Sequence, residues 1–261
     1  MSLTIRLATA LTVVALAAGA GGCAREPGAS PETPENGSAE SADSEGQLTG
    51  STLPSDVGYA WDIATYTGTD PIPVQLSVAG PWTLTAGADW SVSTTKIVAP
   101  EDVPGIDQFQ EFDFVEMAVE AGGTRYYPRQ VTDEWLLQLG SITVTDAGPT
   151  VEPYAEPMKV WPLGFEVGDS SVVLDGENFR IEATVLAKNQ ATVPAGVIED
   201  AYLVRFEFIP VTAGAISGTQ YYILAPDVGF VAAFGASAGD EATGFTALES
   251  VRVLMTMPEK R

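Results

Sequence analysis

Most of the side chains in this chain that could take part in chemistry are carboxylates. The 261 residues include 35 Asp and Glu but no His, and the single Cys is Cys23. Without His, the chain cannot form a Ser-His-Asp or Cys-His catalytic arrangement or a His-ligated zinc site. With one Cys it cannot form a disulfide within the chain. Any catalysis would therefore depend on carboxylates.

Paired carboxylates can divide the acid and base roles of glycoside hydrolysis when a cleft holds them at a suitable distance. Adjacent acids occur at Glu101-Asp102, Asp133-Glu134, Glu199-Asp200 and Asp240-Glu241. Neighbouring residues on a strand point to opposite faces of a sheet, which separates the two members of each doublet. We therefore predict that the chain is not an enzyme and has no catalytic residue.

No motif indicates a metal or cofactor site. Calcium needs only oxygen ligands, but the Asp-Gly-Glu-Asn segment at 175–178 is too short for the twelve-residue calcium loop. The segment 235–240 is predicted to be a polar loop, and it lacks the Gly-Lys-Ser ending of a phosphate-binding loop. We expect neither a metal nor a cofactor.

The tryptophans could line a cavity for a sugar or a lipid. Core packing explains them equally well, because Trp side chains are usually well buried in β-proteins. The sequence therefore does not identify the residues of a ligand cavity among Trp61, Trp82, Trp90, Trp135 and Trp161.

The charge of the chain restricts its partners. Twelve Lys and Arg against 35 Asp and Glu give a net charge of −23. A phosphate backbone would be repelled, so we exclude nucleic acid as a partner. Anionic lipid headgroups would be repelled in the same way, so attachment to a membrane requires a hydrophobic anchor.

Residues 1–22 have the layout of an export signal. Arg6 gives a short basic start, residues 7–18 form an apolar run, and small residues follow. The run of about twelve residues is too short to span a bilayer. A non-cleaved N-terminal anchor is the alternative.

The sequence Ala20-Gly21-Gly22-Cys23 resembles the bacterial lipobox, in which small residues precede a Cys that is lipidated and becomes the mature N-terminus. This chain departs from the usual pattern in having Ala20 where Leu is common. The resemblance implies that lipid on Cys23 anchors the protein to the extracytoplasmic face of the cell membrane. Ordinary secretion, with Cys23 incidental, is the alternative.

Composition divides the chain into three parts. After the predicted signal peptide at 1–22, residues 23–50 hold Cys23 and a Gly, Ser, Pro and Glu-rich tether that cannot bury enough apolar surface to fold. Its root-mean-square reach is roughly 30 Å. Residues 51–261 are predicted to form one β-rich exported domain, with two lobes at about 51–157 and 158–261 as an option.

The domain is predicted to be mainly β, as an antiparallel twisted sheet or an incomplete barrel or sandwich with few short helices. Hairpins are expected at Gly122-Gly123, at 175–178 and at 226–229. Residues 133–139 could form a short helix capped by Asp133, or a strand that continues through 142–144.

Alternating residues indicate which strand faces are buried, and the last strand is expected at 247–257. The predicted buried faces carry Phe179, Ile181, Ala183 and Val185 on one strand, and Val204, Phe206 and Phe208 on another.

Residues 162–231 resemble a widespread group of exported bacterial proteins and lipoproteins of largely uncharacterised function. Three phrases carry the resemblance in the expected order: PLGFEVGDS at 162–170, VPAGVIEDAYLV at 193–204 and YYILAPDVGFV at 221–231. Asp227 replaces a Gly of that group, and Ala232 replaces a residue that is often basic. The resemblance implies a twisted β-sheet or incomplete barrel in an exported protein, and it implies no known reaction.

These observations favour a non-catalytic lipoprotein whose β-domain binds an apolar small molecule or an envelope partner protein. Two alternatives remain, namely a carboxylate-based hydrolase of envelope polysaccharide and a structural or assembly lipoprotein. Cys23 is the one site residue that the sequence assigns.

Overall fold

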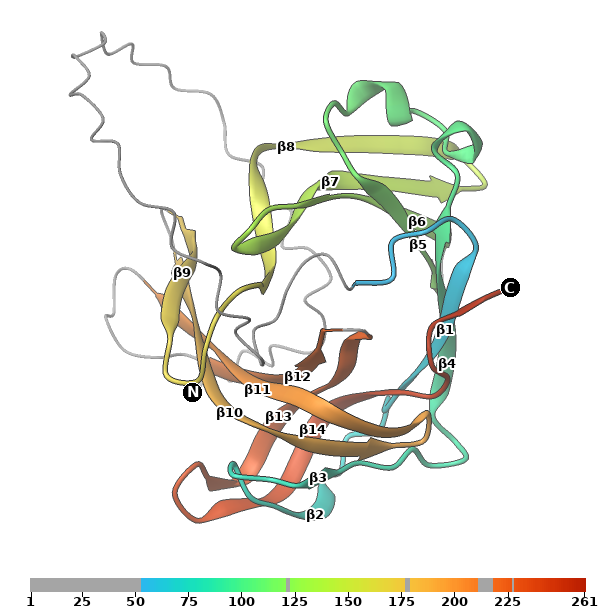
Figure 1. Ribbon diagram of the computed structural model, residues 1–261. Helices are drawn as coiled ribbons and strands as arrows, with labels where there is room; N and C mark the ends of the chain where they lie inside the picture. The colour runs from blue at the N-terminus through green and yellow to red at the C-terminus, as the bar shows by residue number, and fades with distance from the viewer. Residues whose placement is uncertain (1–52, 121–122, 177–178, 211–217, 227) are drawn as a thin grey trace, which may run out of the picture. The chain divides into compact units, whose positions relative to one another are not determined.

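The computed structural model describes residues 53–120, 123–176, 179–210, 218–226 and 228–261. Most of these residues lie in strands, which form one mixed twisted sheet of 15 strands that is not closed into a barrel (Figure 1). The mainly β fold expected from the sequence is confirmed.

In the part of the chain that the structure describes, the strands are accompanied by two short 3₁₀ turns, η2 (Pro100–Asp102) and η3 (Ile106–Gln108). The first strands are β1 (Tyr59–Thr65), β2 (Ile72–Leu76), β3 (Trp82–Thr83), β4 (Ser91–Val98), β5 (Phe114–Glu120), β6 (Gly123–Val131), β7 (Trp135–Thr145) and β8 (Gly148–Pro162). The others are β9 (Ser170–Asp175), β10 (Phe179–Val193), β11 (Gly196–Pro210), β12 (Gly218–Ala225), β13 (Gly229–Asp240), β14 (Gly244–Leu254) and β15 (Glu259–Lys260).

The order of hydrogen-bonded neighbours places an early strand in the middle of the sheet. The order is β3-β10-β11-β12-β13-β14-β1-β4-β5-β6-β7-β8, while β15 pairs with β1, β2 with β14 and β9 with β10. Only the β3–β10 pair is parallel among the described strands. Strand β1 therefore joins the strands β4 to β8 to the strands of the second half of the chain.

The three predicted hairpins are confirmed. Strands β5 and β6 meet at Glu120 and Gly123, β9 and β10 at Asp175 and Arg180, and β12 and β13 at Ala225 and Gly229. Gly122, residues 177–178 and Asp227 lie outside the described residues. Short turns fix these pairings because they bring adjacent segments together with little loss of chain entropy.

Two local expectations are resolved or corrected by the sheet. The helix considered for 133–139 is wrong, because residues from Trp135 onward belong to β7, whose backbone pairs with β6 and β8. The polar loop expected at 235–240 is also wrong, because this segment is the end of β13 and pairs with β14. In both places the neighbouring strands override the local sequence preference.

The final strand begins earlier than expected. It was predicted at 247–257, and β14 covers Gly244–Leu254, with the short β15 following it.

Prolines occupy the outer strand at one end of the sheet. Strand β8 pairs only with β7 in the ladder and carries Pro149, Pro153, Pro157 and Pro162. Proline has no backbone N–H and is confined in sheets to edge strands, strand ends and bulges. Its density on β8 therefore matches the edge position of this strand.

The described residues form two hydrophobic clusters that hold the sheet together. The larger one includes the predicted faces of β10 and β11, where Ile181, Ala183 and Val185 are buried, as are Val204 and Phe206. Phe179 and Phe208 are partly buried against the same cluster. The smaller cluster lies beside the 3₁₀ turns and consists of Val103, Phe109, Val115 and Ile142.

A matched pair of valines tests this burial pattern. Val231→Ala on β13 removes two methyl groups from a side chain that is 0% exposed, and we expect it to lower the free energy of unfolding by about 2 kcal/mol. Val92→Ala on β4, where the side chain is 60% exposed, should change it by less than about 0.5 kcal/mol. Urea unfolding measures both, and equal losses would contradict the assigned burial.

Candidate functional site

The five tryptophans have different environments. Trp82 is fully buried and its ring N–H donates to the Ser77 carbonyl at 3.0 Å, while Trp135 packs edge-on against Phe165. Trp90 is partly buried beside Tyr66. Trp61 and Trp161 are the two that line one small apolar space. Core packing thus accounts for most of the tryptophans.

We call that space the Trp161 hole. Its free volume is about 10 Å³, on the order of a single water molecule. Leu53, the first described residue, is only 7% exposed and forms part of its wall. The lining consists of Leu53, Pro54, Trp61, Phe114, Glu116, Leu136, Trp161, Val228 and Gly229.

A series of hydrogen-bonded side chains starts at Glu116, the charged residue among the described residues of this lining. Two guanidinium nitrogens of Arg129 donate to Glu116 Oε2 at 3.1 and 3.0 Å, and a third donates to Gln138 Oε1 at 2.7 Å. The Gln138 amide donates to the Tyr154 hydroxyl at 3.0 Å, and burial raises the pKa of Tyr154. Arg129 therefore compensates the Glu116 charge inside the sheet, as a buried ion pair requires.

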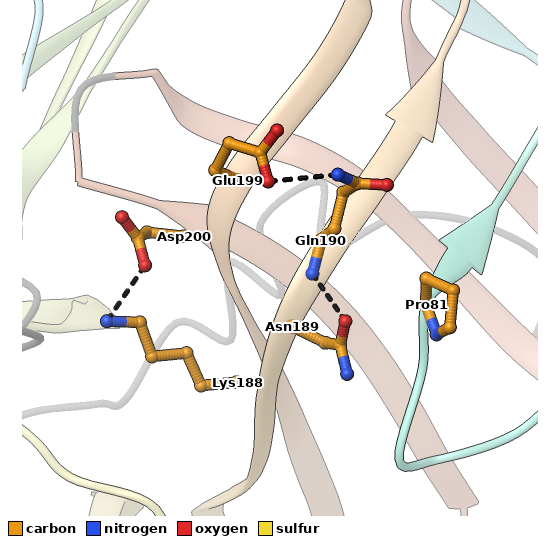
Figure 2. Close-up of a pocket in the computed structure, with 6 residues that line it drawn as sticks. All are labelled: Pro81, Lys188, Asn189, Gln190, Glu199 and Asp200. Atoms are coloured by element: carbon orange, nitrogen blue, oxygen red, sulfur yellow. Dashed lines mark hydrogen bonds and ion pairs between the residues drawn. The ribbon is translucent and has the colours of Figure 1, made fainter.

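A larger depression lies on β10 and β11, and we call it the β10–β11 depression. It has a volume of about 520 Å³ and is broadly open to solvent. Figure 2 shows its lining, which is Pro81, Lys188, Asn189, Gln190, Glu199 and Asp200.

A β-bulge brings two adjacent acids into this depression. Asn189 pairs with Ala201 and Ala191 pairs with Ile198, so Gln190 lies opposite both Glu199 and Asp200. A bulge interrupts the strict alternation of side chains along a strand. The expectation that adjacent acids on a strand diverge is therefore wrong for this doublet. Residue types alone gave no signal of the bulge.

Each carboxylate is held by a side chain from β10. Lys188 Nζ lies 3.0 Å from Asp200 Oδ1, and the Gln190 amide donates to Glu199 Oε2 at 2.9 Å (Figure 2). Lys188 also lies over the Tyr202 ring, 5.3 Å from its centroid. Partial burial favours the neutral amine, but the hydrogen bond and charge of Asp200 oppose this effect, and the pKa of Lys188 is raised. The lysine is therefore a cation at neutral pH.

The third wall of the depression comes from the segment before β3. The Asn189 side-chain amide donates to the Ala79 carbonyl at 2.6 Å, and Pro81 lines the depression beside it. The result is a surface that presents carboxylate acceptors, one ammonium group and two amides from fixed positions. Such a surface can recognise a polar or charged group, and its openness gives no exclusion of water.

The other acid doublets do not form comparable sites. Glu101 and Asp102 are exposed on η2, and Asp133 and Glu134 are exposed before β7. Asp240 accepts hydrogen bonds from Thr243 and Ala242, which lower the pKa of its carboxyl.

Glu241 belongs to a separate cluster on the neighbouring strands. Its carboxylate lies 3.0 Å from the Arg205 guanidinium and accepts from the Tyr221 hydroxyl at 3.1 Å. Arg205 also pairs with Glu207 at 3.2 Å. These contacts are internal to the sheet and give the cluster a structural role.

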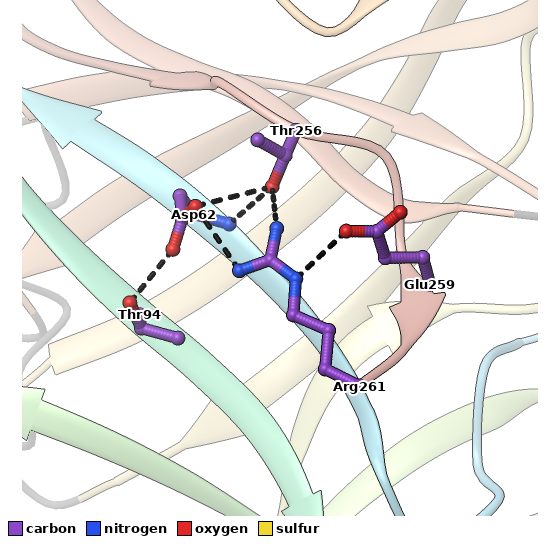
Figure 3. Close-up of polar contacts among 5 residues, drawn as sticks. All are labelled: Asp62, Thr94, Thr256, Glu259 and Arg261. Carbon is purple, nitrogen blue, oxygen red and sulfur yellow. Dashed lines mark hydrogen bonds and ion pairs between the residues drawn. The ribbon is translucent and has the colours of Figure 1, made fainter.

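Another polar cluster fixes β1 between its neighbours. Asp62 Oδ1 accepts from Thr94 Oγ1 at 2.7 Å, and the Asp62 backbone N–H donates to Thr256 Oγ1 at 2.9 Å. Arg261 reaches Asp62 Oδ2 at 3.3 Å and Glu259 at 2.8 Å (Figure 3). Asp62 thus ties β1 to β4 on one side and to the segment after β14 on the other.

Cys23, the one site residue assigned by sequence, lies outside the described residues. Among the residues that are described, no group of three or more His, Cys, Asp and Glu is arranged to hold a metal ion. In the same part of the chain, no helix has the length and apolar character needed to cross a membrane.

Comparisons with known proteins give no further assignment. The chain matches no family model, no curated protein and no solved structure. The resemblance of residues 162–231 to exported bacterial proteins therefore stays a prediction.

The buried and partly buried tyrosines predict how the free energy of unfolding depends on pH. Burial first, and then the charge and hydrogen bond of Glu241, raise the pKa of Tyr221, while burial raises the pKa of Tyr154, Tyr202 and Tyr222. The unfolded chain loses these protons above about pH 10, before the folded chain does, so the free energy of unfolding should fall as the pH rises past 10.

Tyr221→Phe tests this dependence. The variant should lose stability less steeply than the wild type between pH 9.5 and 11, as measured by urea unfolding. The difference in the free energy of unfolding between the two proteins at pH 8 gives the separate cost of the lost hydrogen bond to Glu241. Parallel stability curves for the two proteins would contradict the assignment.

Proposed function

We propose that this protein is an exported lipoprotein, anchored through lipid on Cys23, whose non-catalytic β-domain binds an envelope partner protein through the β10–β11 depression. The lipid-anchored location, on the extracytoplasmic face of the cell membrane, is supported by the signal-like leader, by the lipobox-like sequence and by the position of the only Cys. The net charge of −23 supports a lipid anchor over an electrostatic one.

The observation that carries the binding role is the bulge that places Glu199 and Asp200 together. Both carboxylates are held across the β10–β11 ladder, by Gln190 and Lys188. Side chains that are already ordered lose little conformational entropy when a partner binds. The depression is therefore prepared for recognition of polar or cationic groups.

The openness of the depression favours a macromolecular partner over a small molecule. Small ligands are usually enclosed in concave, mostly apolar pockets that cover most of their surface. The β10–β11 depression is open and its lining is mostly polar. A partner protein can cover such a surface from outside, and charge complementarity would speed its association with the acidic domain.

The same geometry weighs against the hydrolase alternative. A carboxylate hydrolase needs two carboxyl groups on either side of the scissile bond in a cleft. Glu199 and Asp200 lie next to each other on one strand, at an open surface. Binding is the function that this arrangement supports best.

The anchor is tested by Cys23→Ser. We expect the variant to move from the membrane fraction to the soluble fraction and to lose incorporation of a clickable fatty acid, because the acidic domain has no other attraction to anionic lipid. Ser38→Ala, a change elsewhere in the tether, is the control and should stay lipidated. A Cys23→Ser protein that remains in the membrane fraction would refute the anchor.

The binding surface is tested by site-specific photo-crosslinking in cells. A photoreactive residue at Val197, which is 56% exposed on β11 and two residues from Glu199, should give one defined protein adduct. The adduct should be lost when Glu199→Gln and Asp200→Asn are combined. The matched control is the same photoreactive residue at Val92 on β4, which should give no such adduct.

The proposal fails if Val197 gives no adduct. It also fails if the Val197 adduct survives the double substitution, or if Val92 gives the same adduct.

A further inference from the structure

Among the described residues 53–58, which precede β1, Leu53 is the one with a buried side chain. Leu53 is buried, whereas Ser55, Asp56 and Val57 are exposed. Among the described residues, the backbone hydrogen bonds of this segment begin with the Asp56 carbonyl, which accepts from Tyr59 N–H at 3.2 Å. Leu53 packs in the larger hydrophobic cluster.

The other walls of the Trp161 hole come from strands that are far apart in the sequence. Trp61 lies on β1, Phe114 on β5, Leu136 on β7 and Trp161 on β8. Val228, from the connection between β12 and β13, also lines the hole. These residues form an aromatic and aliphatic environment of the kind that accepts hydrocarbon groups.

Gly229 shows how closely this environment is packed. A Cβ atom on Gly229 would lie 2.9 Å from the Trp161 ring and 3.4 Å from Leu53 Cδ2. The Trp161 ring and the Leu53 methyl group therefore lie side by side over the Gly229 backbone. Removal of the Leu53 side chain would open a space bounded by Trp161, and its size would suit the end of an aliphatic chain.

The charge at this site limits the head group that a ligand could carry. Among the described lining residues Glu116 is the only charged one, and Arg129 already neutralises it through two hydrogen bonds. A second anion brought near Glu116 would find no free cation among the described residues of the lining and would meet an acidic domain. An uncharged chain end meets no such penalty.

We propose that the Trp161 hole, enlarged when the Leu53 side chain moves out of its wall, is a binding site for the end of an uncharged aliphatic chain. The ligand and the Leu53 side chain compete for the same space, so the apparent affinity of the wild type is the intrinsic affinity multiplied by the fraction of molecules in which Leu53 leaves that space free. This site is separate from the β10–β11 depression and does not depend on the function proposed for it.

Titration with 1-octanol tests the proposal, with Trp fluorescence as the readout because Trp61 and Trp161 line the hole. The wild type should show weak saturable binding. Affinity should rise through Leu53→Val to Leu53→Ala, by at least about tenfold at the end of the series, as the competing side chain shrinks. Octanoate should bind more weakly than 1-octanol to every variant.

Val57→Ala is the matched control, because Val57 lies in the same segment but is exposed, and it should bind 1-octanol as the wild type does. Near-ultraviolet circular dichroism checks that each variant is folded, and Leu53→Val changes the packing least if Leu53→Ala unfolds. The proposal is overturned if folded Leu53 variants bind 1-octanol no more tightly than Val57→Ala. It is also overturned if no protein shows saturable binding.

Discussion

The sheet depends on hydrogen bonds that β1 makes on both of its edges. This strand pairs with β4 from Ala60 to Thr65 and with β14 from Ile63 to Thr65. Asp62 adds side-chain bonds toward Thr94 and Thr256, so the same strand is fixed by main chain and side chains. Without β1, the strands β4 to β8 would have no hydrogen-bonded connection to β14 in the described ladder.

The Trp161 hole lies where this connection brings distant segments together. Trp61 is on β1 itself, Phe114 and Leu136 belong to the strands on one side, and Val228 and Gly229 belong to the β12–β13 connection on the other. The β10–β11 depression, in contrast, is built almost entirely from one hairpin and the segment before β3. The Trp161 hole therefore depends on the packing of distant strands, whereas the β10–β11 depression depends mainly on one hairpin.

Turn residues and alternating apolar residues predicted the hairpins and strand faces, which form between neighbouring segments of the chain. The hairpin at Asp175 and the alternating face through Ile181 follow from turn residues and a period of two, and both were predictable. The position of β1 between β14 and β4 was not, because residue types do not specify which distant strand becomes a neighbour. The bulge at Glu199 and Asp200 was missed for a related reason, since it depends on the register with β10.

The prolines of β8 have a consequence for how copies of the protein behave when they are crowded. Molecules confined to a membrane surface by the proposed anchor would collide often, and an edge strand with free N–H groups can recruit another chain into a growing intermolecular sheet. Pro149, Pro153 and Pro157 remove donors at regular intervals along this edge. Strand β8 can therefore remain at the end of the sheet without making a high surface density an aggregation hazard.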